Sequence, residues 1–99
     1  MPLLLDSGVL QVDIEEKHKY CTNRFIELAN ELKDEDIDIT LVSGALMTAS
    51  GIYATYVAAG NNGVLEESGL DKVVALYRRT LEHYQNIRRD ELKAAGTAH

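Results

Sequence analysis

The segment from Ile39 to Leu65 has no charged side chain, and it constrains the fold more than any other feature of the sequence. Elsewhere charge is frequent, since 26% of all residues are Asp, Glu, Lys or Arg. On a helical wheel, the part up to Ala59 has a wide apolar arc and a narrow stripe of small residues opposite. The arc holds Val42, Ala45, Leu46, Ala49, Ile52, Tyr53, Tyr56 and Val57, and the stripe holds Thr40, Gly44, Thr48, Gly51 and Thr55.

Three interpretations fit a helix with two such faces. A transmembrane span needs about twenty predominantly apolar residues, but here Thr, Ser and Gly interrupt the run and no basic residue flanks it. A monomeric three-helix domain would leave the weakly polar stripe in water. A homodimer would cover both sides of the helix, because small residues about four apart let a second backbone approach closely. The sequence favours the homodimer, with a possible dimer face at Gly44, Thr48, Gly51 and Thr55.

Two amphipathic helices are predicted on either side of this segment. In the first, apolar positions alternate steps of four and three residues: Ile14, His18, Cys21, Phe25, Leu28 and Leu32. In the third, they are Leu70, Val73, Val74, Tyr77, Leu81, Tyr84 and Ile87. Asp13 can cap the first helix, Asp36 or Asp38 the second, and Ser68 with Asp71 approximates a capping box for the third. Gly60 supplies a left-handed stop after the second.

The predicted fold is all-α, a single domain over residues 1–99. Its three main helices span about 13–33, 38–59 and 69–95, and the central helix is largely buried in a small, dimeric bundle. The opening residues Leu3 to Val12 form two short apolar runs around Asp-Ser-Gly, which predict a short N-terminal arm or a small hairpin.

Composition excludes several kinds of partner and compartment. A formal net charge of -6 disfavours nucleic acid and anionic membrane as main partners, because both reward Lys and Arg. The lone Cys21 cannot form an internal disulfide, which fits a reducing compartment. The N-terminus lacks the basic start and apolar core of a signal peptide. We therefore expect a cytoplasmic protein that binds neither nucleic acid nor membrane.

Metal and cofactor sites are weakly indicated. His18 and Cys21, three residues apart, can place two ligands on one metal, and His83 could join them, but a fourth ligand is missing and core packing explains the seam. The acids from Asp34 to Asp38 start like a calcium loop but lack its Gly and its bidentate Glu. We expect no cofactor and no metal. A Tyr/His-lined pocket for a small ligand remains an alternative to core packing, with His18, Tyr53, Tyr56, Tyr77 and His83 as its residues.

Two arginine pairs, Arg78-Arg79 and Arg88-Arg89, repeat at ten residues on the third helix. They could bind phosphate, a carboxylate ligand or an acidic protein surface. The alternative is internal neutralisation by the acid-rich first helix and the linker that follows it. No phosphate loop, nucleophile elbow or carboxylate-His constellation occurs, so the sequence favours a non-enzymatic protein.

The segments 25–31 (FIELANE), 43–49 (SGALMTA), 53–59 (YATYVAA) and 74–81 (VALYRRTL) resemble a family of short helical bacterial proteins catalogued only as a domain of unknown function. The resemblance covers residues from about 15 to 90 and implies a helical fold without implying an activity. In that family an Arg and an Asn flank the aromatic residue near Tyr53, where this chain has Ile52 and Ala54.

These observations lead to two functional hypotheses. The first is a non-enzymatic interaction or regulatory module that acts as a homodimer and contacts an unknown protein partner through Arg78, Arg79, Arg88 and Arg89. The second is a small-ligand-binding protein or minor enzyme that uses the Tyr/His-lined pocket.

Overall fold

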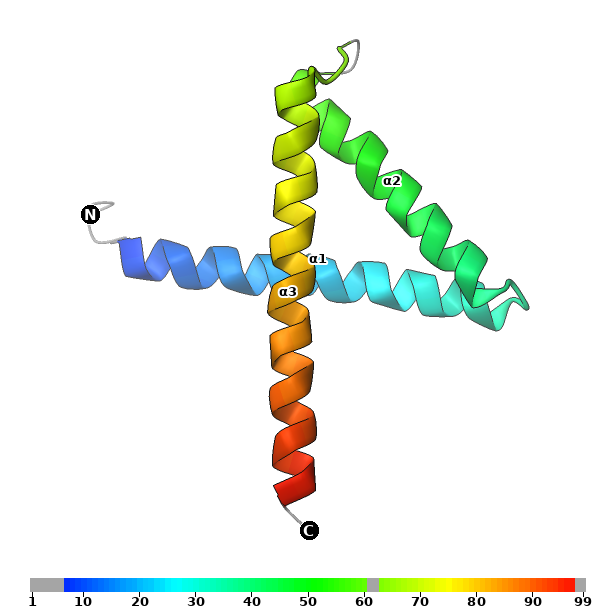
Figure 1. Cartoon of the computed structure of the whole chain (residues 1–99), viewed down its shortest axis with the longest axis vertical. Helices are drawn as coiled ribbons and strands as arrows, with labels where there is room; N and C mark the ends of the chain where they lie inside the picture. The colour runs from blue at the N-terminus through cyan, green and yellow to red at the C-terminus, as the bar shows by residue number, and fades with distance from the viewer. Residues whose placement is uncertain (1–6, 61–62, 98–99) are drawn as a thin grey trace. The chain divides into compact units, whose positions relative to one another are not determined.

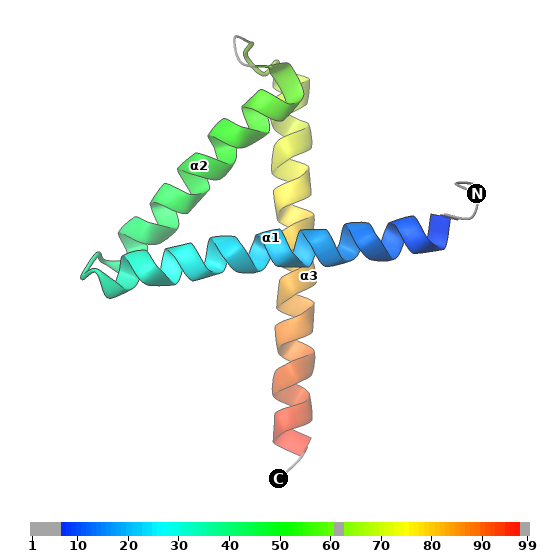
Figure 2. The same cartoon turned by 180° about the vertical axis from the view of Figure 1, so that it is seen from behind.

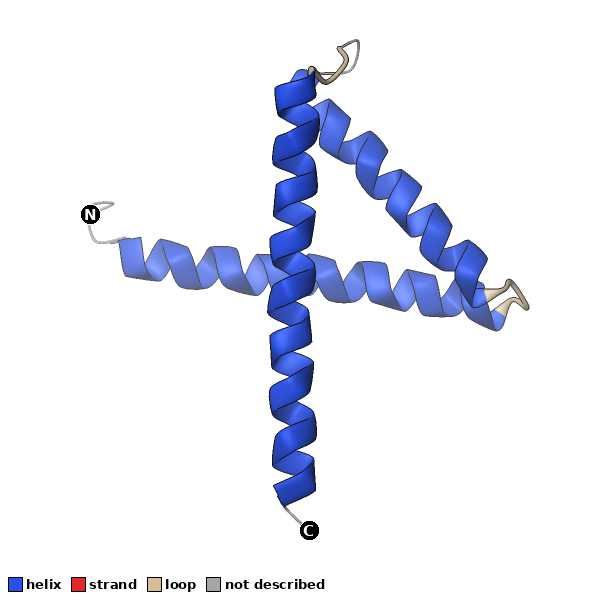
Figure 3. Cartoon of the chain, viewed as in Figure 1, coloured by secondary structure: helices blue, strands red, loops and turns tan. Residues whose placement is uncertain are grey.

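The computed structural model describes residues 7–60 and 63–97, which form three α-helices. They are α1 (Ser7–Asp34), α2 (Ile39–Ala59) and α3 (Glu67–Thr97), each an unbroken helix in both views (Figure 1, Figure 2). Within these described residues everything outside the helices is turn or loop, and no strand is present (Figure 3). The predicted all-α class with three main helices is therefore confirmed.

The chain divides into two units, Met1–Ala49 and Ser50–His99. The first unit contains α1 and the N-terminal half of α2, and the second contains the rest of α2 and α3. The boundary thus lies inside the helix that carries no charge.

The first helix begins at Ser7, six residues before the predicted start at residue 13. The predicted arm or hairpin is therefore wrong for residues 7–12, which are helical; residues 1–6 lie outside the described part of the chain. The misleading signal was Asp13, which is not a cap. Its Oδ2 lies 3.0 Å from Nζ of Lys17 within the helix. A long amphipathic helix extends into preceding residues at little cost, because elongation adds one hydrogen bond per residue fixed.

The turn between α1 and α2 is built by acidic residues. The backbone N–H of Asp36 donates to the carbonyl of Lys33 at 3.2 Å, and Asp36 has a φ of 65°, the left-handed conformation that Asp tolerates better than most residues. Asp38 then caps α2, because its Oδ1 accepts the backbone N–H of Thr40 at 2.8 Å. This confirms the predicted start of α2.

Two glycines shape the turn between α2 and α3. The N–H of Gly60 donates to the carbonyl of Tyr56 at 2.9 Å, and its φ of 80° ends the helix where the sequence predicted. A Cβ at Gly63 would overlap the carbonyl oxygen of Ala59, so this position has no room for a side chain. The third helix then starts at Glu67, two residues before the predicted start at 69.

Burial differs from the prediction more than secondary structure does. Among the residues whose exposure is described, only Val42 is buried, with 6% of its surface exposed. The prediction that the central helix is largely buried is therefore not confirmed by the chain alone. The bundle packing and the dimer on which that prediction depended are taken up below as proposals.

Candidate interaction surfaces

The small-residue stripe of α2 contains hydroxyl groups, but they are satisfied within the helix, and the space beside its glycines is open. Oγ1 of Thr48 donates to the carbonyl of Gly44 at 3.0 Å, and Oγ1 of Thr55 donates to the carbonyl of Gly51 at 2.9 Å. A Cβ added at Gly44 or Gly51 would meet nothing within 4 Å. At the four predicted dimer-face residues, the two hydroxyls are thus satisfied inside the helix, and the two glycines leave free space beside it.

The wide arc of α2 is also largely uncovered in the single chain. Leu46 is 40% exposed, Ile52 50% and Tyr53 71%. Apolar side chains of this size stabilise a fold by roughly 1.5–3 kcal/mol each when they are fully buried. The helix therefore has apolar surface to cover on both its faces.

By length and composition alone, α2 is the one helix in the described part of the chain that could cross a membrane. Only 6% of its most apolar window is buried. The nearest flanking charges are acidic on both sides, Asp38 before the helix and Glu66 after it. The positive flank that orients most membrane helices is absent from these positions.

The arginines of α3 interact mostly with the same helix. Nε of Arg78 lies 3.5 Å from Oε1 of Glu82, and Nη1 of Arg88 lies 2.9 Å from Oε1 of Glu91. Nη1 of Arg89 donates to Oδ1 of Asn86 at 3.0 Å. These contacts join residues three or four apart, which is the spacing that brings side chains together on a helix surface.

Neutralisation of the arginines is therefore local and incomplete. The hydrogen bond from Arg88 to Glu91, together with the charge of that carboxylate and of Tyr84, raises the pKa of the Arg88 guanidinium. Across the described residues, neither Arg79 nor Arg89 forms an ion pair with a carboxylate. Internal neutralisation by the acids of α1 stays a prediction.

The residues of the predicted Tyr/His pocket are exposed. Tyr53 and Tyr56 lie edge to face, with ring centroids 6.3 Å apart and an interplanar angle of 68°. Tyr56 and Tyr77 are each 47% exposed, and His83 is exposed as well. The fifth residue, His18, belongs to the other unit, and its backbone carbonyl accepts Oγ1 of Thr22 at 2.9 Å. A ligand pocket at these residues stays a prediction.

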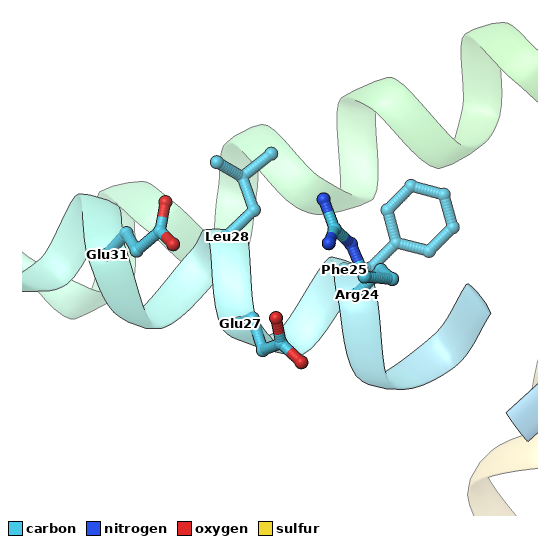
Figure 4. Close-up of a pocket in the computed structure, with 5 residues that line it drawn as sticks. All are labelled: Arg24, Phe25, Glu27, Leu28 and Glu31. Carbon is cyan, nitrogen blue, oxygen red and sulfur yellow. The ribbon is translucent and has the colours of Figure 1, made fainter. Parts of the chain in front are cut away.

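A shallow depression on α1 is a feature that the sequence reasoning missed. Its volume is about 260 Å³, and its lining residues are Arg24, Phe25, Glu27, Leu28 and Glu31 (Figure 4). All five belong to one helix, so it cannot enclose a small molecule as ligand pockets usually do. The signal was nevertheless present, because residues 24, 27, 28 and 31 have the spacing i, i+3, i+4 and i+7 of one helix face.

Metal binding receives no geometric support from the described residues, among which no three His, Cys, Asp or Glu side chains group closely enough to hold an ion. Cys21 is a free thiol and exposed.

Compared with known proteins, the chain matches no family model, no curated protein and no solved structure. The resemblance noted from the segment at Phe25–Glu31 stays a prediction. Function is therefore inferred from the surfaces themselves.

Proposed function

We propose that the protein is a non-enzymatic interaction or regulatory module that acts as a homodimer in the cytoplasm. The observation that carries this proposal is the contrast in α2 between its composition and its exposure. The helix has no charged side chain over its 21 residues, yet Val42 is its only buried residue. In water such a surface associates with other apolar surface, because removing it from solvent is favourable.

A second copy of the chain is the occupant that suits α2 best. The wide arc and the stripe lie on opposite sides of the helix, so one layer of protein covers only one of them. The stripe accepts a close neighbour, since nothing occupies the space beside Gly44 and Gly51. Twofold association supplies the second layer from the same sequence, without a separate partner.

The outer face of α3 is the proposed contact for a protein partner. Arg78 and Arg88 are paired with their own helix, while Arg79 and Arg89 lack a carboxylate partner among the described residues. Guanidinium groups bind carboxylates with two parallel hydrogen bonds, and an acidic protein surface provides such groups. A partner of this kind would contact all four arginines along one stretch of the helix.

Native mass spectrometry and sedimentation of the purified chain test the homodimer directly. We expect a dimer at micromolar concentration with no retained metal or small molecule. A monomer up to about 100 µM would contradict the dimer, since a surface this apolar should associate well below that concentration.

Two other outcomes would replace the proposal. A stoichiometric small-molecule adduct would favour the ligand-binding alternative. Flotation of the chain with neutral phosphatidylcholine vesicles would indicate that lipid, and not a second copy, covers α2.

A further inference from the structure

A second apolar surface lies on α1, and its residues follow a regular alternation of steps. Its residues follow steps of four, three, four, three and four: Ile14, His18, Cys21, Phe25, Leu28 and Leu32. The average step is therefore 3.6 residues, the period of an α-helix, so the whole row stays on one face of the helix. We call this row the α1 seam.

The α1 seam is exposed in the chain. Ile14 is 58% exposed, Phe25 60% and Leu28 53%, while Leu32 is half-buried. The depression described above overlaps the seam, because Phe25 and Leu28 belong to both (Figure 4). The surface is thus an exposed apolar row with a shallow hollow along it.

We propose that two copies of α1 pair antiparallel along this seam, a geometry that rests on the homodimer proposed above. The steps read the same in both directions about the level of Asn23. A reversed copy therefore places Ile14 opposite Leu32, His18 opposite Leu28, and Cys21 opposite Phe25, with every layer repeated by the twofold axis. Each seam residue then has a facing seam residue.

Charge decides between the antiparallel and parallel orientations. In the antiparallel register, Lys17 and Glu31 flank the seam on the same side and face each other across the two copies, twice by symmetry. Arg24 meets its own copy at the axis, which is one repulsive contact against two attractive ones. In a parallel register Lys17 faces Thr22 and Arg24 faces Ala29, so neither forms an ion pair.

Lys17 and Glu31 are both available for this contact between the two copies. Glu31 has no ion pair within the described residues. Lys17 contacts Asp13 at 3.0 Å, but the two side chains are 76% and 55% exposed. An ion pair this exposed contributes little stability, so Lys17 can exchange Asp13 for a carboxylate of the second copy. Lys17 and Glu31 lie 14 residues apart on one straight helix, a separation of about 21 Å. They cannot interact directly within one chain.

Charge exchange tests the register. Lys17→Glu and Glu31→Lys each place like charges at both symmetric contacts, and we expect each to weaken self-association about tenfold. The double variant K17E/E31K restores opposite charges, so its dissociation constant should return to within about twofold of the unmodified chain. A mixture of the two single variants should form mixed dimers above the statistical half, measured by native mass spectrometry with one variant isotopically labelled.

Matched controls separate this contact from net charge and from helix stability. Lys19→Glu and Glu16→Lys make the same charge changes away from the seam and should leave self-association within about twofold. Asp13→Asn removes only the contact of Lys17 within its own helix. Far-UV circular dichroism of every variant checks that the helices are retained.

The results that would overturn the antiparallel pairing are distinct from those that would overturn the homodimer. If the unmodified chain dimerises but the double variant loses the sum of the two single effects, the register is wrong and the homodimer stands. Statistical mixing of the single variants leads to the same conclusion. If the unmodified chain is monomeric, both proposals fail.

Discussion

On α3, Arg78 pairs with Glu82 and Arg88 with Glu91, so the helix forms ion pairs along its own surface. On α2 the polar side chains are Thr and Ser, and the hydroxyls of Thr48 and Thr55 donate to carbonyls of the same helix. Both helices expose large apolar side chains, yet only α3 has a charged face to set against them. Exposure of apolar side chains therefore has a different consequence for each of the two helices. An amphipathic helix can keep one face in water, whereas a helix without a polar face needs cover on every side.

Large side chains on the stripe of α2 should have the largest effect of all the changes considered, and the effect is on self-association. A Cβ at Gly44 or Gly51 meets nothing within 4 Å, but the double variant Gly44→Leu and Gly51→Leu would prevent close approach of a second backbone. We expect self-association to weaken on the order of 100-fold, because overpacking of a fitted interface costs about 1–3 kcal/mol per site. Sedimentation over a concentration series measures this.

Gly96→Leu on α3 is the matched control, since a Cβ at Gly96 also meets nothing within 4 Å. It should leave self-association unchanged. If Gly96→Leu weakened association as much as the double variant, the stripe of α2 would have no special role.

The end of α2 provides the second prediction. Gly60→Ala places a Cβ on a residue with a φ of 80°, where nothing lies within 4 Å, so the cost comes from the backbone alone. We expect the free energy of unfolding to fall by about 1–2 kcal/mol. Gly96→Ala, inside a helix, should instead raise it by a few tenths of a kcal/mol. Thermal unfolding followed by circular dichroism distinguishes the two signs.

The start of α2 provides the third. Asp38→Ala removes the acceptor of the Thr40 N–H at 2.8 Å and should lower the free energy of unfolding by about 1 kcal/mol. Asp38→Asn keeps an acceptor oxygen and should recover most of the loss. Urea titration measures both. Equal losses for Ala and Asn would show that charge at the helix terminus matters more than the hydrogen bond.

The smallest effect is expected on α3. Arg78→Ala removes an ion pair whose side chains are 78% and 59% exposed, and Arg88→Ala removes one that is 47% and 56% exposed. Each should lower the free energy of unfolding by less than about 0.5 kcal/mol in urea titration. A larger loss would mean that these arginines stabilise the fold, and would weaken their assignment as partner contacts.

The ends of α2 could be predicted because single residues determine them. Asp38 has the side chain of an N-cap, and Gly60 has the freedom to adopt a positive φ. The start of α1 could not, because Asp13 resembles a cap in sequence and only the structure shows that it contacts Lys17. Val9, Leu10 and Val12 were interpreted as an apolar run of an arm or hairpin, so the predicted helix was not extended over them.

The candidate surfaces were predicted less well than the helices. Wheel positions identified the stripe at Gly44 to Thr55 and the arginines of α3, because side-chain direction follows from helical geometry. Burial of α2 could not be derived in the same way, since it depends on contacts between helices or between chains that no single-helix pattern specifies. Local pairing of Arg88 with Glu91 was not predicted, although Glu91 lies three residues along the same helix, within reach of the guanidinium.

The internal hydrogen bonds of Thr48 and Thr55 have a consequence for recognition. With each hydroxyl held by the carbonyl one turn back, the γ-methyl groups and the hydrogens of Gly44 and Gly51 are what remains to meet a neighbour. Such an edge has no unsatisfied donor or acceptor to match. Its selectivity for a neighbouring helix would depend on shape complementarity, that is, on how closely the two backbones can approach.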